Sequence, residues 1–191
     1  MNFIIGLLIA AKGIVLFSGI FALSKSNAQL GQPELILSAS EIRLSTQIQN
    51  AFSKDLKKLA NSGTRILIYL FIETREARGD RVVHKVVQSR ELLYDLVDKQ
   101  YAIVRNEIDT TTLATIDAAM IASTTFHNIA VAPVDIIDAQ KRYYFVAYGV
   151  LGKTTVEALE GKELDLMYFW NYRRPTIRTQ RFDGSRFRIE D

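Results

Sequence analysis

The residues best suited to acid–base or metal chemistry are few in this chain. There are two histidines, His84 and His127, and no cysteine. A structural zinc site takes four ligands, mainly Cys and His, so this chain lacks the usual ligand set. We therefore expect no metal site, and we expect both histidines to have structural or surface roles. We place His127 at the end of a helix, where a cation is favoured by the carbonyl groups.

The candidates for nucleophilic or general acid–base catalysis also lack a supporting pattern. Serines such as Ser89 and Ser123 do not lie in a nucleophile-elbow or comparable motif. Asp135 and Asp138 are close in sequence, but their spacing on a strand directs them to opposite faces. The scattered glycines form no phosphate loop and no dinucleotide fingerprint. We therefore expect no catalytic residue and no cofactor, and we predict that the protein is not an enzyme.

Aromatic and arginine residues near the C-terminus are the best candidates for binding. Trp, Tyr and Arg are the residues that dominate the energetics of protein interfaces. Arginines on a mobile tail can also bind lipid phosphates at a membrane surface. The alternative is a core strand with a buried tryptophan and solvated or paired arginines. The candidate residues are Trp170, Tyr172, Arg173, Arg174, Arg178, Arg181, Arg186 and Arg188.

The first residues of the chain read as an export signal. An apolar run over residues 13–23 follows Lys12, and Ser26 and Ala28 place small residues before a cleavage point. That pattern is typical of a signal peptide, residues 1–28. The alternative is an uncleaved anchor over residues 3–23, although Lys12 would be costly inside a membrane. Either reading predicts an exported protein, periplasmic or anchored to the inner membrane facing outward.

The rest of the chain has the composition of a globular domain. Hydrophobic residues make up 48% of the sequence and charged residues 24%. Only two of the 24 basic residues and none of the 21 acidic ones lie in residues 1–28, so the remainder has a net charge of +1. That balance does not favour nucleic acid as a partner. Without cysteine there is no disulfide, and stability must come from packing.

Hydrophobic periodicity predicts two helices and a series of strands. The first helix is expected over residues 46–61, with Thr46 and Gln49 at capping-box spacing. The second is expected over residues 109–126. Strands are expected over residues 34–44, 64–75, 81–96, 101–105, 134–139, 142–151, 166–172 and 176–182. The strands over residues 64–75, 81–96 and 101–105 would form a three-strand meander. The first of these strands, over residues 64–75, would be buried on both faces.

This order of elements predicts an α+β fold. We expect one antiparallel sheet or a two-sheet β-sandwich, with two packed helices and a preceding N-terminal hydrophobic signal or anchor helix. Residues 29–33 would be a linker, residues 34–182 a single domain and residues 183–191 a mobile tail. The sequence contains no pattern that sets an oligomeric state.

The meander resembles a known family. The residues that carry the resemblance occur in order and at characteristic spacing: Phe71, Ile72, Glu73, Arg75, Asp80, Arg81, Val82, Leu92, Leu93, Tyr94, Asp95, Gln100 and Tyr101. They resemble an uncharacterised bacterial family of exported proteins, classed as a domain of unknown function, over about residues 42–104. The resemblance implies a bacterial envelope protein and brings no catalytic residue with it.

Three classes of function are compatible with these patterns. The first is a non-enzymatic envelope protein that acts through contacts with an envelope protein partner or the membrane surface. The second is a small carrier of an apolar ligand or lipid, which requires an open apolar cavity. The third is a hydrolytic enzyme with a dispersed site, which requires polar side chains that converge in a cleft. The aromatic and arginine residues favour the first class.

Overall fold

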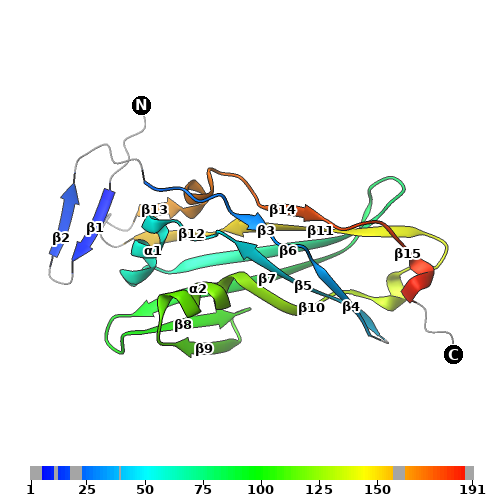
Figure 1. The fold of residues 1–191 in the computed structure, drawn as a ribbon, viewed down its shortest axis with the longest axis horizontal. Helices are drawn as coiled ribbons and strands as arrows, with labels where there is room; N and C mark the ends of the chain where they lie inside the picture. Colours follow the sequence, from blue (N-terminus) through cyan, green and yellow to red (C-terminus); the bar gives the residue numbers. More distant parts are fainter. Residues whose placement is uncertain (1–5, 11–12, 18–22, 39, 157–161, 188–191) are drawn as a thin grey trace.

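Two antiparallel sheets form the body of the protein. The computed structural model describes residues 6–10, 13–17, 23–38, 40–156 and 162–187 (Figure 1). The large sheet has seven strands in the order β14-β11-β6-β7-β8-β9, with β15 also paired to β11. Its strands are β6 (Ile66–Glu76), β7 (Val82–Asp95), β8 (Gln100–Arg105), β9 (Asp109–Leu113), β11 (Arg142–Leu151), β14 (Thr176–Arg178) and β15 (Phe182–Asp183).

The smaller sheet packs against one face of the large one. It contains β3 (Gln29–Leu30), β4 (Glu34–Leu37), β5 (Glu41–Gln49) and β10 (Thr125–Pro133). In Figure 1, β5 and β4 cross in front of the long strands of the large sheet. A hydrogen bond of 3.2 Å from the Thr74 hydroxyl to the Val131 carbonyl joins the two layers. The expected α+β class with antiparallel pairing is confirmed, and the large sheet curls into a half-barrel.

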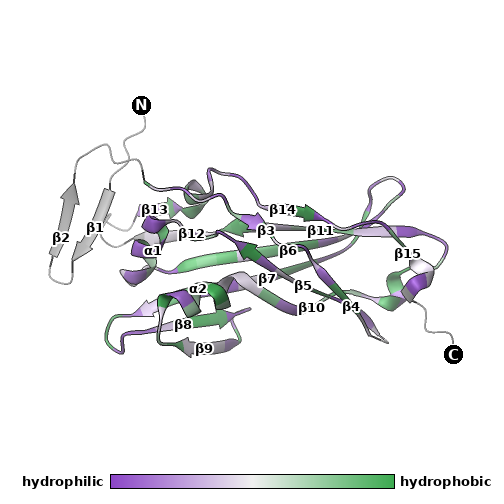
Figure 2. Cartoon of the chain, in the orientation of Figure 1, coloured by the Kyte–Doolittle hydropathy of each residue, from purple (hydrophilic) through white to green (hydrophobic). Residues whose placement is uncertain are grey.

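The core lies between the two sheets. Ile66, Ile68, Leu70 and Ile72 of β6 are all buried, because alternate residues of a strand point to the same face. Residues from β5 pack against them, and Figure 2 shows hydrophobic and hydrophilic residues alternating along that strand. The prediction that this strand is buried on both faces is wrong: Tyr69, among the residues of the opposite parity, is only partly buried.

The first helix is shorter than predicted. α1 (Lys54–Asn61) begins after Ser53, whose hydroxyl accepts a 3.2 Å hydrogen bond from the Leu56 N–H. The expected Thr46–Gln49 capping box is wrong, because both residues lie in β5. Alternation of polar and apolar residues along residues 41–49 has the period of a strand, and it outweighs the capping signal.

The second helix is also shorter, and the meander is longer. α2 (Ile116–Thr124) begins after Thr115, which accepts a hydrogen bond from the Ala118 N–H. Residues 109–113 are the strand β9 and extend the meander, since their β-branched threonines favour extended backbone. His127 therefore lies in β10 and not at a helix end.

Two predicted strands near the C-terminal end are 3₁₀ helices. η1 (Val134–Ile136) replaces the first half of an expected hairpin, and β11 pairs with β6 instead. η3 (Leu166–Trp170) replaces the strand over residues 166–172, and the Asp165 carboxylate caps it by accepting from the Met167 N–H at 2.9 Å. β12 (Lys153–Val156) and β13 (Lys162–Asp165) form a separate hairpin.

The segments at both ends of the expected domain are described only in part. β1 (Gly6–Ala10) and β2 (Gly13–Phe17) pair as an antiparallel hairpin, in place of the expected hydrophobic helix. Across the described ranges, no helix is long and apolar enough to cross a membrane. The expected linker is partly the strand β3, and η4 (Gly184–Phe187) follows β15 at the start of the expected tail. Residues 188–191, the rest of that tail, lie outside the described residues.

Candidate functional site

A row of aromatic rings crosses the face of the large sheet that points away from the core, which we call the outer face. Tyr69 and Phe71 of β6 and Tyr144 and Tyr148 of β11 have the same parity along their strands and form this aromatic row. The rings of Phe71 and Tyr148 stack with centroids 5.0 Å apart, and those of Tyr69 and Phe71 lie 6.4 Å apart. Three of these rings are therefore in contact on a partly solvated sheet face, whereas Tyr144 lies further along β11, beyond the pair of Val146 and Glu73.

Cationic side chains lie over this aromatic row. The Arg178 guanidinium lies 3.7 Å from the centroid of the Tyr144 ring, and that of Arg174 lies 5.8 Å from the Tyr148 ring. Tyr144 is only 2% exposed as a result. Cation–π contacts contribute about 0.5–1 kcal/mol at exposed sites. Two of the predicted binding arginines are thus held in fixed positions along one edge of the sheet.

Tyr172 is the most exposed aromatic residue among the predicted candidates. Its side chain is 62% exposed, and its backbone has a φ of 56°, next to Asn171 with a φ of 53°. A bulky residue in this left-handed region costs about 1–2 kcal/mol. The Tyr172 N–H compensates in part by donating to the Met167 carbonyl at 2.9 Å, which caps η3. The turn therefore presents a large aromatic side chain to solvent at an energetic cost.

Trp170 does not belong to the exposed surface. It is 2% exposed, and its indole N–H donates a 2.8 Å hydrogen bond to the Ala51 carbonyl. Trp170 therefore has the buried role that the sequence analysis gave as the alternative to a binding surface. A buried indole needs such a partner, and the bond fixes η3 against the turn before α1.

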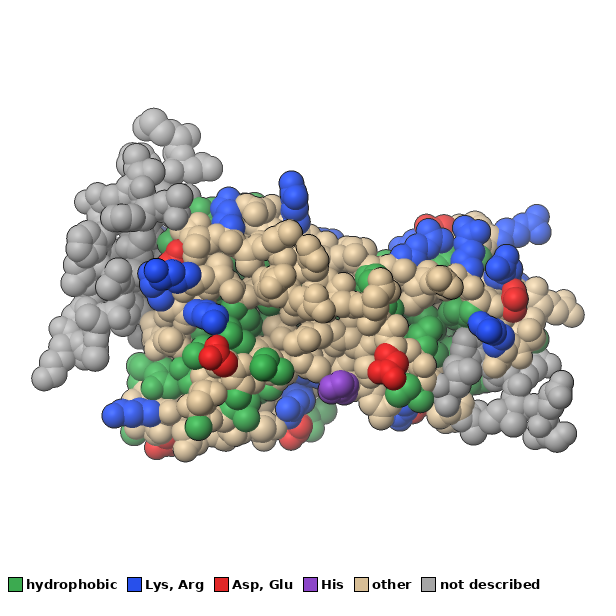
Figure 3. All heavy atoms as spheres, in the orientation of Figure 1, with side chains coloured by type: hydrophobic (Ala, Val, Ile, Leu, Met, Phe, Trp, Pro, Cys, Tyr) green, Lys and Arg blue, Asp and Glu red, His purple; other side chains and the backbone are tan. Residues whose placement is uncertain are grey.

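The other predicted arginines are scattered on the surface. Arg173, Arg181 and Arg186 are exposed and form no ion pair with any described residue. Figure 3 shows that Lys and Arg side chains gather at the end of the molecule where β15 lies. Several cations near that end are neutralised, as in the 3.0 Å pair of Arg142 with Asp183. Arg188 lies outside the described residues.

The end of the predicted signal segment packs beside this site. The Lys25 ammonium lies 4.6 Å from the centroid of the Tyr168 ring, which contacts Tyr172 edge to face at 6.3 Å. The Ser26 N–H donates to the Phe169 carbonyl at 2.8 Å. The backbone N–H of Ser24 donates to the Asp55 carboxylate at 2.6 Å. Residues 23–28 are therefore bound to both η3 and α1.

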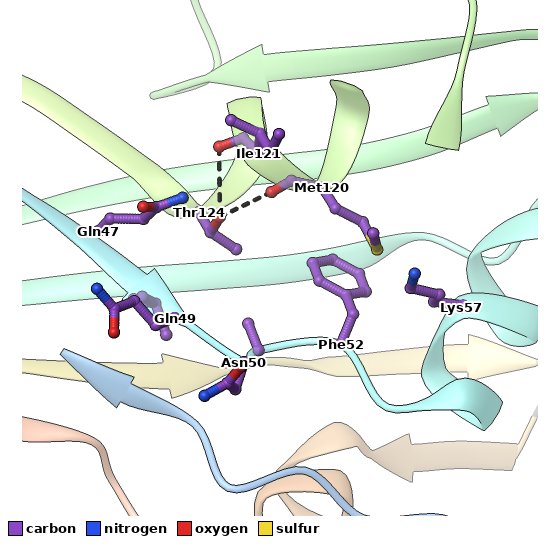
Figure 4. A pocket seen from close by; sticks show the side chains of 10 residues that line it. Gln47, Gln49, Asn50, Phe52, Lys57, Met120, Ile121 and Thr124 are labelled. Atoms are coloured by element: carbon purple, nitrogen blue, oxygen red, sulfur yellow. Dashed lines mark hydrogen bonds between the residues drawn. The ribbon is translucent and has the colours of Figure 1, made fainter. Parts of the chain in front are cut away.

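An open pocket lies between β5, α1 and α2 (Figure 4). Its volume is about 220 Å³, and Figure 4 shows Phe52 and Met120 side by side within it. Polar side chains of Gln47, Gln49 and Lys57 line the remainder. Pockets for drug-sized ligands usually measure about 300–1,000 Å³. This pocket is small for a lipid, so it gives the carrier function no support.

A buried arginine lies on the core side of β7. Arg90 is 4% exposed, and its guanidinium lies 4.7 Å from the centroid of the Phe126 ring. One terminal nitrogen donates to the Ser89 carbonyl at 2.8 Å, whereas Nε has no partner among the described residues. Burial and the neighbouring Arg105 lower the pKa of Arg90. This cation belongs to the packing between β7 and β10.

The predicted acid–base candidates are not assembled into a centre. Asp135 lies in η1 and not on a strand, and the Asp138 carboxylate accepts the Gln140 N–H at 2.9 Å, which makes it a turn residue. His84 lies in β7, directly opposite Thr74 of β6. Within the described part of the chain, no group of three or more histidine, aspartate or glutamate side chains is arranged to hold a metal ion.

Comparison with known families finds a family of unknown function over the region that contains the meander. Residues 25–150 match a domain of unknown function, DUF4390. The chain belongs to the DUF4390 family. The matched region of this DUF4390 protein is longer than residues 42–104, and it begins inside the segment predicted to be a signal peptide. No curated protein and no solved structure matches the chain.

The sequence interpretation missed the whole aromatic row, Tyr69 included. Phe71, Tyr144, Tyr148 and Lys85 were not among the predicted binding residues, yet Lys85 lies 5.2 Å from the Phe71 ring centroid on the outer face. The signal was available, because aromatic residues recur at a spacing of two or four along β6 and β11. Strands with one solvated face show this alternation, whereas the segment looked apolar on both faces.

Proposed function

We propose that this protein is a non-enzymatic binding protein of the cell envelope, which acts through contacts with a partner protein. The observation that supports this most is the set of exposed side chains in the turn between η3 and β14, beside the aromatic row: Tyr172, Arg173 and Arg174. Tyrosine and arginine contribute much of the energy at protein interfaces. The strained turn fixes the backbone at Tyr172 and the cation–π contact holds Arg174, so less conformational entropy is lost when these two residues bind.

The envelope location is part of the proposal. It is supported by the apolar N-terminal run and by the resemblance to exported bacterial proteins. The non-enzymatic role is supported by the lack of a nucleophile motif in the sequence. A membrane surface is the other partner that these arginines suit, because guanidinium groups bind lipid phosphates.

The test compares two variants that lose the same charge. The site variant carries Tyr172→Ala, Arg173→Gln and Arg174→Gln, and the control carries Lys54→Gln and Lys99→Gln, which are exposed residues elsewhere. Each full-length protein is purified from the envelope of its own cells after cross-linking, and co-purified proteins are identified by mass spectrometry. We expect the site variant to lose a protein that the wild type and the control retain.

Vesicle flotation distinguishes the two partners. The same proteins are mixed with vesicles of phosphatidylcholine containing phosphatidylglycerol. If only vesicle binding depends on the site variant, the membrane surface is the partner and the proposed protein contact is wrong. If the site variant and the control recover the same proteins and bind vesicles equally, neither a protein partner nor a membrane surface binds at this site.

A further inference from the structure

One half of β7 forms an open edge of the large sheet. β7 pairs with β6 from Val82 to Leu92, but β8 pairs only with the second half of β7, from Arg90 to Asp95. Among the described residues, the edge from Val82 to Gln88 has no neighbouring strand in its own sheet. Unpaired strand edges are templates for pairing with another chain, and natural proteins usually protect them.

The direction of the free backbone groups follows from Ser89. Its N–H donates to the side-chain oxygen of Asn106 at 2.9 Å, and its carbonyl accepts from the Asn106 N–H at 3.1 Å. Both groups of Ser89 therefore point away from β6. In an antiparallel strand the direction alternates from one residue to the next. The N–H and C=O groups of Val87 and Lys85 thus point to the same open edge, where no described residue pairs with them.

The side chains beside this edge are suited to a partner strand that carries both an apolar and a charged residue on the outer face. Val87 is 46% exposed on the outer face, and Lys85 lies next to it on that face. The Lys85 ammonium has a loose 3.8 Å contact with Glu73. An acidic residue directly opposite Lys85 would form a cross-strand pair of opposite charges.

A second copy of this chain does not fit the edge well. In a two-fold register that pairs Val87 with Lys85 of the other copy, Val83 of that copy would lie opposite Ser89. Asn106 already occupies this position, because it bonds to both backbone groups of Ser89. A register centred on Lys85 places two lysines directly opposite each other, which is destabilising. Self-pairing is therefore disfavoured in these two registers, and the edge remains open to a different chain.

We infer that the first half of β7 binds an extended segment of a partner protein as an added antiparallel strand, with an acidic residue opposite Lys85. Backbone hydrogen bonds to Val87 and Lys85 would supply affinity, and the alternating side chains would supply specificity. This inference goes beyond the proposed function, because it uses a different part of the sheet from Tyr172, Arg173 and Arg174.

The test uses the isotope-labelled full chain and a short synthetic peptide of alternating threonine and valine with a central glutamate. Binding is followed by NMR, together with amide hydrogen exchange. We expect protection of the amides of Val87 and Lys85, whereas Val86 already bonds to β6 and should change little. N-methylation of the peptide residues that face β7 should abolish binding, and N-methylation of the alternate residues should not.

Two variants complete the test. Lys85→Glu should weaken binding of the glutamate peptide by roughly two- to fivefold, and a peptide with a central lysine should bind this variant with the original affinity. Val87→Pro should abolish binding without unfolding the domain, because proline is tolerated where the N–H of an edge strand faces solvent. Arg174→Gln should leave peptide binding unchanged, which separates this result from the proposed function.

Three outcomes overturn the inference. One is no binding of the glutamate peptide at millimolar concentration by the folded wild type. Another is binding that is insensitive to N-methylation, which would mean that side chains of the outer face hold the peptide. The third is a dimer in light scattering that Val87→Pro dissociates, which would make a second copy the occupant of the edge.

Discussion

Charged side chains have two kinds of surroundings in this protein. Arg178 and Arg174 lie over tyrosine rings of the large sheet, so their positions are set by the fold. The exposed side chain of Arg173 forms no ion pair or ring contact with any described residue, so it is free to bind another molecule. Asp55 belongs to the first kind, since its carboxylate accepts from the Ser24 N–H at 2.6 Å and from Lys58 at 3.0 Å.

Replacing Asp55 with Asn should destabilise the protein in a pH-dependent way. Burial alone raises the pKa of Asp55, but the hydrogen bonds from Ser24 and Lys58 outweigh it and hold that pKa below its ordinary value. The carboxylate therefore stabilises the fold at pH values above its unfolded pKa of about 3.9, and this is lost as pH falls through the lower folded pKa. We expect Asp55→Asn to lower the free energy of unfolding by about 1 kcal/mol at pH 7.

Urea unfolding of both proteins at pH 7, 5 and 3 measures this effect. The difference between them should be constant from pH 7 to pH 5 and should shrink towards pH 3. A difference that stays the same at all three values would mean that Asp55 titrates normally. Asp98→Asn, an exposed carboxylate with no ion pair among the described residues, is the matched control.

Elements with a clear hydrophobic period could be predicted from the sequence, and those defined by turns could not. The alternating residues of β7 and β8 identify these strands to within one residue at each end. In contrast, the apolar run of η3 has the composition of a strand, and only the Asp165 cap and the Trp170 bond to Ala51 distinguish it. Both contacts depend on distant parts of the chain or on backbone conformation.

The same limit applies to the candidate site. The type of residue could be predicted, because arginine and aromatic residues are concentrated near the C-terminus. Which of these residues are exposed could not be predicted. Trp170 is buried and Tyr172 is exposed because a tight turn with positive φ values separates them. Tyr144 and Tyr148 joined the site only when β11 paired with β6 and not with the residues directly before it.

Removing the segment before β3 should destabilise the domain. We compare a chain that begins at Leu23 with one that begins at Gln29. The shorter chain lacks the bonds from Ser24 and Ser26 and the packing of Leu23 against the core. Hydrogen bonds contribute about 0.5–1.5 kcal/mol each, so we expect a loss of about 2–4 kcal/mol in the free energy of unfolding.

Denaturant unfolding of the two chains checks this expectation. Ser26→Ala in the longer chain should reproduce part of the loss, which tests whether the contacts and not the length are responsible. Equal stability of the two chains would mean that the segment contributes nothing, and cleavage after Ala28 would then leave the fold intact. A large loss would instead mean that cleavage after Ala28 destabilises the domain.

The described part of the molecule has a core that both sheets share. Buried residues of β5, β6, β7, β10 and β11 belong to a single cluster, together with residues of both helices and η3. Neither sheet can keep its apolar face covered without the other. No disulfide links the layers, since the chain contains no cysteine. Loss of one sheet should therefore expose the core face of the other and unfold it.

The two sheets and η3 should accordingly unfold in one transition. Trp170 is the single tryptophan, and it lies at the end of the core next to α1. Its fluorescence reports on that end alone, whereas far-UV circular dichroism reports on all strands. Coincident urea transitions by the two probes are the mark of two-state unfolding. An earlier fluorescence transition would show that η3 and its contacts separate first, so that the exposed turn at Tyr172 rests on a locally unstable element. Such a result would also weaken the proposed function, because that function depends on a fixed position of this turn.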